Sequence, residues 1–242
     1  MAYSKVHSRH ELGNLVFYDG QYRQRWLDVI GPNAIKFIED FGGDILDNWT
    51  GTAVAGTTSV TSYDAEGGAI LLYTAGSDND GYQIQKLEGF KAVDDCPLYF
   101  GVRWKITGMA GGASAGILMG LAPVDTTLLD TPGDGIYFHS GSAGAALNLT
   151  LNTGGTAIDA EALAAIVADT WYVDEFYWDG DDTVKAWHDG AYVCSGSAAS
   201  MDQTQRMAVS IAYDDSGGAP SGTSGLVVDW VRAFQLLDVR NA

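Results

Sequence analysis

The sequence has few of the residues that would tie it to a disulfide framework or a membrane. Only two of its 242 residues are cysteine, Cys96 and Cys194, so no disulfide network is expected to hold the fold. This indicates synthesis in a reducing compartment, although a single disulfide stays open. No run approaches the roughly 20 apolar residues of a membrane span. The first residues also lack the apolar core of a signal peptide. We therefore expect a soluble protein with no visible secretion signal and no membrane partner.

Basic residues are also scarce. The chain has 13 Lys and Arg residues against 31 Asp and Glu residues, which gives a formal net charge of −18. Such a body would repel phosphates, so we expect no nucleic-acid partner. Residues 1–40 contain five basic and five acidic residues, so their charges cancel and residues 41–242 carry all of the −18. Two interpretations stay open: the acidic body is only a solubilising surface, or a neutral segment docks while the acidic body faces solvent.

Long helical patterns of apolar residues are absent as well. From Phe41 onward, short segments with the composition of strands alternate with clusters of Gly, Ser, Thr, Asn and Asp. Many short strands with frequent turn signals predict an all-β protein, an antiparallel β-sandwich. The candidate strands are Thr58–Tyr63, Ala69–Thr74, Tyr82–Lys86, Leu98–Ile106, Ser114–Pro123, Gly135–His139, Ala146–Asn152, Trp171–Trp178, Thr183–Trp187, Met207–Tyr213 and Leu226–Leu236.

Two segments have spacings that a helix would also fit. Ala160–Ala168 is rich in Ala and has Leu163, Ile166 and Val167 at helical spacing, which predicts a short helix. Ala34–Phe41 has apolar residues near the same spacing, and both a helix and an extended strand remain open there.

The strand pattern is densest between Thr170 and Ser195. Trp171–Trp178 is almost entirely aromatic, β-branched or acidic, which is typical of a half-buried strand. Asp179–Asp182 and Asp189-Gly190 are turn sequences, because Gly accepts a positive φ and Asp bonds to its own backbone. The pattern predicts three antiparallel strands joined by two tight turns.

This stretch also carries a family resemblance. A Trp that opens a strand, a DG turn, a strand that ends in W-x-DG and a short return strand resemble the laminin-G/concanavalin-A-like jelly-roll family. Gly225–Leu236 is similar to the closing strand of that fold. The resemblance implies a jelly-roll β-sandwich, a fold that hosts lectins, glycosidases and structural modules alike.

A second, narrower resemblance covers roughly residues 41–236. Its segments occur in the order FGGDILDNW, AEGGAILLYT, SDNDGYQIQ, LYFGVRWKI and GLA…DGIYF. In this order they resemble tailed-phage virion proteins that have a jelly-roll body. The resemblance implies a structural role on a phage particle, as a capsid decoration or head-associated protein made in the host cytoplasm. It also implies the major capsid protein or another virion protein as partner, and a homo-oligomer.

We expect residues 1–40 to form an N-terminal docking segment and residues 41–242 to form the jelly roll. Aromatic and basic residues are interleaved in the first segment, which matches the composition of an interface core. The residues expected to dock on the partner are Phe17, Tyr18, Tyr22, Arg23, Arg25 and Trp26.

A carbohydrate-binding, lectin-like module is the alternative function, because aromatic side chains offer flat faces to sugar rings. Most of the seven Trp side chains should lie in the core. We expect Trp104, Trp171 and Trp230 there, since they lie in apolar strands. Candidate glycan contacts near turns are Trp49, Trp187 and Tyr192.

A glycoside hydrolase is the less favoured third function. Hydrolysis needs two carboxylates about 5–9 Å apart across the sugar bond. Only six Glu residues occur, and no two are close in sequence. Asp174 and Glu175 are neighbours, but on a strand they point to opposite faces and cannot flank one sugar. We therefore predict no enzyme and no catalytic residues, and we expect Asp174→Asn to change stability little.

No cofactor is expected either. The four histidines and two cysteines show no spacing typical of metal ligands. Two Asp-rich turns concentrate oxygen ligands of the kind that Ca²⁺ prefers, but neither matches the EF-hand loop. The weak calcium candidates are Asp78, Asp80, Asp179 and Asp181.

Overall fold

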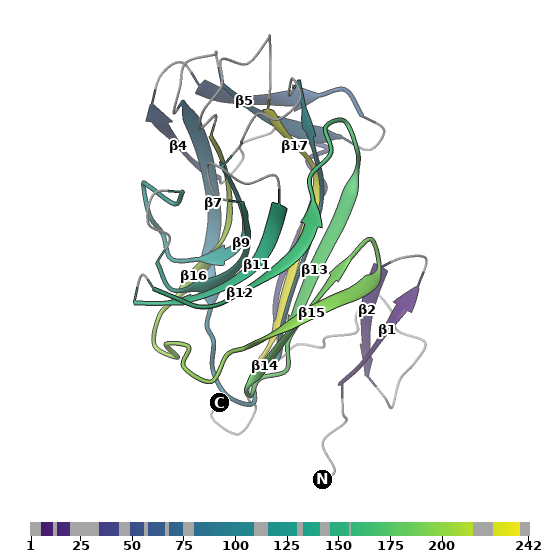
Figure 1. The fold of residues 1–242 in the computed structure, drawn as a ribbon, viewed down its shortest axis with the longest axis vertical. Helices are drawn as coiled ribbons and strands as arrows, with labels where there is room; N and C mark the ends of the chain where they lie inside the picture. Colours follow the sequence, from purple (N-terminus) through teal and green to yellow (C-terminus); the bar gives the residue numbers. More distant parts are fainter. Residues whose placement is uncertain are drawn as a thin grey trace.

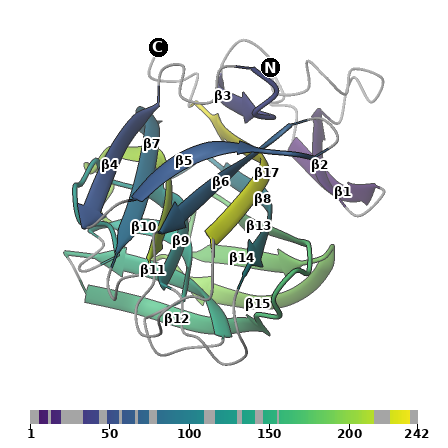
Figure 2. The same cartoon turned by 90° about the horizontal axis from the view of Figure 1, so that it is seen from above.

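The computed structural model contains two antiparallel β-sheets packed face to face, with a separate hairpin near the N-terminus (Figures 1 and 2). The predicted all-β sandwich is confirmed. The structure describes residues 6–11, 14–19, 34–43, 49–55, 58–65, 68–74, 80–108, 116–129, 133–140, 146–154, 156–214 and 225–237. No helix within these ranges is long and apolar enough to cross a membrane.

One sheet has seven strands in the order β12-β11-β10-β9-β16-β7-β4. Its strands alternate apolar residues, which face the other sheet, with small or polar residues on the opposite face. The strands are β4 (Thr50–Ala55), β7 (Gly81–Phe90), β9 (Gly116–Ala122), β10 (Gly135–Ser140), β11 (Ala146–Thr153), β12 (Thr156–Ala165) and β16 (Met207–Asp214).

The other sheet has eight strands in the order β15-β14-β13-β8-β17-β6-β5, with β3 also paired to β17. Its long strand β17 pairs with β8 along most of its length. The strands are β3 (Ala34–Glu39), β5 (Thr58–Tyr63), β6 (Ala69–Thr74), β8 (Leu98–Thr107), β13 (Tyr172–Trp178), β14 (Thr183–His188), β15 (Ala191–Ser197) and β17 (Gly225–Leu236). The N-terminal hairpin consists of β1 (Val6–Glu11) and β2 (Asn14–Asp19).

The hydrophobic core fills the space between the two large sheets. Phe138 from the seven-stranded sheet contacts Phe100 and Phe176 from the other, with ring centroids 6.4 and 5.6 Å apart. Phe100 and Phe176 stack on each other at 5.3 Å. All three rings are fully buried, so this aromatic cluster joins the two layers.

The predicted meander between Thr170 and Ser195 is confirmed. β13 pairs with β14, and β14 pairs with β15, both antiparallel. The second turn has Asp189 and Gly190 at φ values of 49° and 75°, the left-handed region that a tight two-residue hairpin requires. The sequence therefore placed both turns of this unit correctly.

The predicted helix over Ala160–Ala168 is wrong. Residues 156–165 form β12, which pairs antiparallel with β11 at the edge of the seven-stranded sheet. Leu163 is buried in the core while Ala162 and Ala165 are exposed, a pattern that an edge strand accommodates. The neighbouring strand offers backbone hydrogen bonds across the whole segment, which outweighs the modest helix propensity of Ala.

Both a helix and a strand were open for Ala34–Phe41. The structure shows that this segment contains strand β3. It pairs with the second half of β17, from Leu236↔Ala34 to Val231↔Glu39. Its Phe37 is buried in the main core. A boundary between residues 40 and 41 therefore divides β3 from the sandwich to which it is hydrogen-bonded.

Candidate functional site

Two of the three predicted glycan contacts lie together on the β14–β15 hairpin. Trp187 and Tyr192 are register partners across the two strands, and their rings meet edge to face with centroids 6.1 Å apart. A bulge next to Trp187 brings both rings to the same side. Tyr192 is 57% exposed, the highest value for an aromatic side chain among the residues whose burial the structure describes. The pair thus presents an accessible aromatic surface at the edge of a sheet.

A buried support lies beside this aromatic pair. Trp187 packs against the buried Tyr99 on the outer face of the eight-stranded sheet, the face turned away from the core. Tyr177 and Phe234 pack against the same Tyr99. Glu175 lies directly opposite Trp187 in the ladder and is fully buried. Its Oε1 accepts a hydrogen bond of 2.7 Å from the Tyr99 hydroxyl. Burial, followed by the nearby Glu175 carboxylate, raises the pKa of Tyr99 well above its usual value.

The third predicted glycan contact, Trp49, is not a surface residue. It is buried in the main core, where its ring meets the rings of Phe37 and Phe41. Its Nε1–H donates to Glu39 at 3.2 Å. The expectation of exposure, based on the turn residues near Trp49, is therefore wrong. Packing against β3, which the turn signals do not reveal, accounts for the difference.

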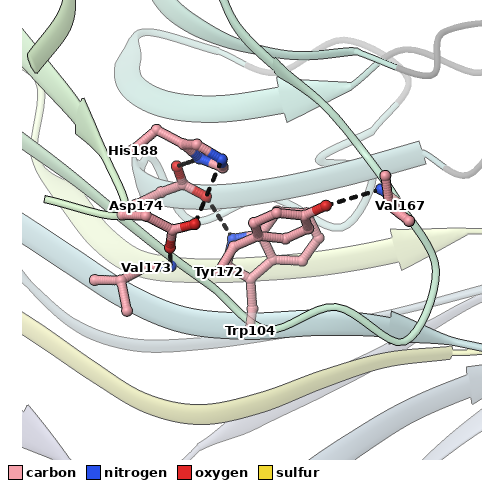
Figure 3. A network of polar contacts seen from close by, with 7 residues as sticks. Trp104, Val167, Tyr172, Val173, Asp174 and His188 are labelled. Carbon is pink, nitrogen blue, oxygen red and sulfur yellow. Dashed lines mark hydrogen bonds and ion pairs between the residues drawn. The ribbon is translucent and has the colours of Figure 1, made fainter. Parts of the chain in front are cut away.

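A polar network lies on the inner face of the same strands (Figure 3). Asp174 is fully buried, and its Oδ2 accepts a hydrogen bond of 2.6 Å from the Trp104 indole. Its other oxygen, Oδ1, lies 2.7 Å from Nδ1 of His188. The His188 side chain is 20% exposed, and the Tyr172 ring packs against it at 5.0 Å. Asp174 therefore holds His188 in one orientation at the border between core and solvent.

The outer residues of this network, Tyr172 and Asp189, accept backbone hydrogen bonds near the ends of the strands. The Tyr172 hydroxyl accepts a hydrogen bond of 3.0 Å from the backbone of Val167, beyond the end of β12 (Figure 3). The Asp189 carboxylate accepts one of 2.9 Å from the backbone of Val173. Asp189 also lies 3.8 Å from Nε2 of His188. The imidazole therefore has a carboxylate on each side.

The environment shifts the pKa of both members of the Asp174–His188 pair. Burial raises the pKa of the Asp174 carboxyl, and the hydrogen bonds from His188 and Trp104 only partly oppose that effect. The hydrogen bond to Asp174 raises the pKa of His188, while partial burial opposes the shift. The pair therefore retains a proton to a higher pH than an isolated histidine would.

The two neighbouring carboxylates serve opposite sides of the sheet, as their alternation predicts. Asp174 bonds to Trp104 and His188 on the inner face, whereas Glu175 bonds to Tyr99 on the outer face. They cannot act on the same sugar as acid and base. An oriented Asp–His pair occurs in many active sites, but it also satisfies a buried carboxylate in a structural role.

The expectation that Trp171, directly before β13, lies in the core is wrong. Tyr172, Asp174, Phe176 and Trp178 are the members that are buried towards the core, while Trp171 and Val173 are only partly buried on the outer face. Among the three Trp residues expected in the core, Trp104 is buried as predicted, but Trp171 and Trp230 are partly exposed.

The weak calcium candidates are not gathered into a site in the described residues. No group of three or more His, Cys, Asp or Glu side chains suited to a metal occurs within these ranges. Asp80 is buried, and Asp179 accepts backbone hydrogen bonds from Asp181 and Thr183 within its own turn. Like-charge repulsion, mainly from Asp182, raises the pKa of Asp181. Asp78 lies outside the described residues.

The face of the seven-stranded sheet that is turned away from the core is unusually polar. Gln83 and Gln85 on β7 hold the segment that follows β9. The Gln83 side chain bonds to backbone atoms of Asp125 and Leu128, and the Gln85 side chain bonds to those of Pro123 and Asp125. Leu128, fully buried, packs on this face beside Tyr137. This segment therefore covers part of the sheet.

Beyond that segment, polar side chains continue across β10 and β11. His139 and Asn148 are register partners and are both partly exposed. Asn152 donates a hydrogen bond of 3.0 Å to the Tyr137 hydroxyl, and burial raises the pKa of Tyr137 to about 12. Burial also lowers the pKa of His139. The sequence interpretation missed these residues, although the alternation of Asn148, Thr150 and Asn152 with leucines marks such a face.

The structure does not test the residues predicted to dock on a partner. Tyr22, Arg23, Arg25 and Trp26 lie outside the described residues. Phe17 and Tyr18 belong to β2, of which the structure describes the strand and its pairing. Docking by this segment stays a prediction.

Comparisons with known proteins reveal a shared fold and no close relative. No protein-family model matches the chain, and no curated protein matches it. Peanut lectin has a similar structure, with a TM-score of 0.60, 10% identity, and coverage of 84% of this chain and 97% of the lectin. The carbohydrate recognition domain of Emp47p has a TM-score of 0.59 and 13% identity, covering 84% of this chain and 95% of that domain.

An enzyme is also among the similar structures. The endo-β-1,4-glucuronan lyase of the fungus Trichoderma reesei has a TM-score of 0.56 and 12% identity, covering 81% of this chain and 94% of the lyase. At such low identity, these likenesses show the fold alone. The chain has a concanavalin A-like jelly-roll sandwich, as the first resemblance implied. A virion role receives no support from these proteins.

Proposed function

We propose that this protein is a carbohydrate-binding, lectin-like module. The observation that carries the proposal is the Trp187–Tyr192 pair, in which Tyr192 is exposed and the two rings meet at 6.1 Å on the β14–β15 hairpin. Aromatic side chains are common in ligand sites, where a few polar groups add orientation and specificity. Two of the similar structures, peanut lectin and the Emp47p domain, are described as a lectin and a carbohydrate recognition domain. They support binding over catalysis, and the lyase shows that the same fold also serves an enzyme.

The buried residues behind the pair support a preformed site. Trp187 packs against the buried Tyr99, so its ring is held without the loss of much side-chain entropy upon binding. Tyr192 is much more exposed and contributes less to folding. It is therefore the cleaner position at which to test ligand binding.

The proposal is tested by glycan-array screening followed by calorimetry with the glycan that binds most tightly. Tyr192→Ala should weaken binding at least tenfold, because removal of an aromatic anchor at a binding site typically costs more than 1 kcal/mol. Val193→Ala, a change at the exposed neighbouring residue in β15, should leave affinity unchanged. Unchanged affinity in Tyr192→Ala would exclude this pair as the contact.

A matched variant on the other sheet distinguishes two questions: whether the protein binds glycans, and at which surface it binds them. Asn148→Ala changes the polar outer face of the seven-stranded sheet and leaves the hairpin intact. If only Asn148→Ala lost binding, the lectin-like function would stand and the site would move. If no glycan bound to the wild type, the function itself would be wrong. Release of unsaturated products from a polyuronate would instead demonstrate a lyase.

The virion role is a narrower expectation, and it rests on the resemblance to tailed-phage proteins. We propose it only as a location for the same module, with residues 1–40 as the attachment to a capsid or another virion protein. A lectin-like module on a particle would place the aromatic pair where host glycans can reach it. Detection of the protein in purified particles, and its loss from them after deletion of residues 1–33, would establish this role.

A further inference from the structure

The basic residues of this acidic protein are gathered on one face. Eight Lys and Arg residues occur between residues 34 and 237. Five of them lie on the outer face of the eight-stranded sheet, where each alternates with core residues along its strand. These five are Lys36, Arg103, Lys105, Lys185 and Arg232. A chain with a net charge of −18 therefore places five of its cations on one sheet face, where the Glu175 carboxylate also lies and Asp229 pairs with Arg103.

Two of these cations form a compact patch with aromatic rings. The guanidinium carbon of Arg103 lies 4.3 Å from the centroid of the Trp171 ring. Nζ of Lys105 lies 4.9 Å from the centroids of both Trp171 and Tyr63. We call these four residues the Lys105 patch. Tyr63 lies on β5, Arg103 and Lys105 lie on β8, and Trp171 directly precedes β13; all three strands belong to the eight-stranded sheet (Figure 2).

An apolar floor supports the patch. Tyr63 and Trp171 pack against Ala69, Leu71 and Val227, which are buried on the outer face. Each of the four patch residues is partly buried, so its side chain is held on the sheet. The ammonium group of Lys105 is therefore positioned by two rings before any ligand arrives.

The two cations of the patch differ in how their charge is balanced. Arg103 forms an ion pair with Asp229, which lies beside it on β17. No carboxylate of the described residues lies within 4.0 Å of the Lys105 ammonium group, which contacts the two rings instead. The Lys105 patch thus has one positive charge that no acidic side chain in the described chain neutralises.

The composition of the patch favours a sugar over a protein surface. A stable protein interface needs a large apolar core, of about 1,000 Å² in total or more. None of the large hydrophobic side chains that are strongly exposed in the described chain belongs to the patch. A sugar with a carboxylate requires only ring surface and one oriented cation, and both are present.

We propose that the Lys105 patch binds acidic polysaccharide, with Lys105 pairing with a uronate carboxylate and the rings of Tyr63 and Trp171 contacting the sugar. The inference rests on the proposed carbohydrate-binding function and adds an anionic ligand class and a second surface to it. Arg103 has the smaller role, since Asp229 already neutralises its charge. The affinity for uronates should fall as salt increases, because screening weakens the ion pair.

The test compares oligomers of glucuronic and galacturonic acid with their carboxyl-reduced forms, which keep the sugar rings and lack the charge. By calorimetry, the wild type should bind the acidic oligomers at least about tenfold more tightly, as expected for a charge-assisted hydrogen bond. Lys105→Gln should abolish this preference. Lys105→Arg, which keeps the charge, should retain it.

The matched control is Lys185→Gln, which removes the same charge from an exposed position on the same face. It should keep the preference for acidic oligomers, as should Tyr192→Ala. Equal affinity of the wild type for acidic and reduced oligomers, or an intact preference in folded Lys105→Gln, would overturn the proposal. So would equally tight, Lys105-dependent binding of polyglutamate, because the patch would then be a general anion site. Loss of neutral-glycan binding in Tyr192→Ala tests the proposed function separately.

Discussion

At the scale of single residues, the most consequential feature is a carboxylate in the core. Asp174 has no solvent exposure and is stabilised by hydrogen bonds from Trp104 and His188. A buried charge of this kind is costly unless partners satisfy both of its oxygens. The expectation that Asp174→Asn would change stability little therefore no longer holds.

Asp174→Asn should lower the free energy of unfolding by about 1–3 kcal/mol, the cost of a buried polar group left without a partner. The amide has one acceptor oxygen, so it cannot accept from both Trp104 and His188. Urea denaturation at neutral pH measures the change. Asp182→Asn, at an exposed position in a turn, is the control and should not be destabilised. Equal stability of the wild type and Asp174→Asn would show that the network does not contribute to folding.

The Asp174–His188 pair should also make stability depend on pH. The folded-state pKa of His188 is raised, so its contribution is complete below its ordinary value of 6.5 and is lost as the pH rises through the folded pKa. The pKa of Asp174 is raised as well, so its contribution changes with the same sign. The free energy of unfolding should therefore decrease between pH 6 and pH 9, as measured by urea titrations.

The same series in Asp174→Asn isolates the pair. Without the Asp174 carboxylate, burial lowers the pKa of His188 and only the Asp189 carboxylate still opposes that shift, so the decrease above pH 6 should become smaller. An NMR titration of the His188 imidazole should show the pKa falling in the variant. An unchanged imidazole pKa would contradict the assigned cause.

Trp104 and Trp171 should differ in their contributions to stability. Trp104 is 1% exposed and bonds to Asp174, so Trp104→Ala should cost about 3–5 kcal/mol, the range for large core truncations. Trp171 lies on the outer face among Arg103 and Lys105, so Trp171→Ala should cost only about 1–2 kcal/mol. Urea denaturation of both variants compares them. Similar costs would contradict the face assignment of β13.

At the scale of secondary-structure elements, β17 organises the eight-stranded sheet. One of its edges pairs with β8, and its other edge pairs first with β6 and then with β3. A bulge between Val228 and Trp230 separates the two halves. Strand β3 therefore completes the sheet, even though it precedes residue 41, where the predicted body begins.

Deletion of residues 1–40 should destabilise the protein more than deletion of residues 1–33. The longer deletion removes β3, its ladder with β17 and the buried Phe37 ring, which contacts Trp49. Loss of a buried Phe alone typically costs about 3–5 kcal/mol. Thermal and urea denaturation of the two deletion variants compares their stabilities. Equal stability would show that β3 is dispensable, as the predicted boundary after residue 40 requires.

At the scale of the whole molecule, the net charge of −18 opposes the compact state. Raising NaCl from about 0.1 to 1 M shortens the Debye length from about 10 to 3 Å. The urea midpoint of unfolding should therefore increase with NaCl. Sucrose at equal osmolality, which leaves the charges unscreened, is the control. A midpoint that falls with NaCl would mean that favourable ion pairs, such as Lys86–Glu39, outweigh the repulsion.

The sequence by itself determined most of the strands of the body, the antiparallel order of the meander and the turns within it. Alternation and turn residues are local signals, so β5, β6 and β13 to β15 could be located from neighbouring residues alone. The same alternation placed Asp174 and Glu175 on opposite faces of one strand, and it favoured a β-sandwich over a helical fold. It also identified Trp187 and Tyr192 as candidates, because both lie next to a turn.

Only the tertiary structure decided which face of each strand is buried. A period of two divides the residues of β13 into two sets, but the partner sheet determines which set forms the core, and this placed Trp171 outside and Asp174 inside. The contacts that decide it join residues far apart in sequence: Trp104 and Asp174 are 70 positions apart. The same reasoning applies to the burial of Trp49 and to the pairing of β3 and β12. Their environments come from distant strands that bury them or pair with them, and no local pattern encodes that proximity.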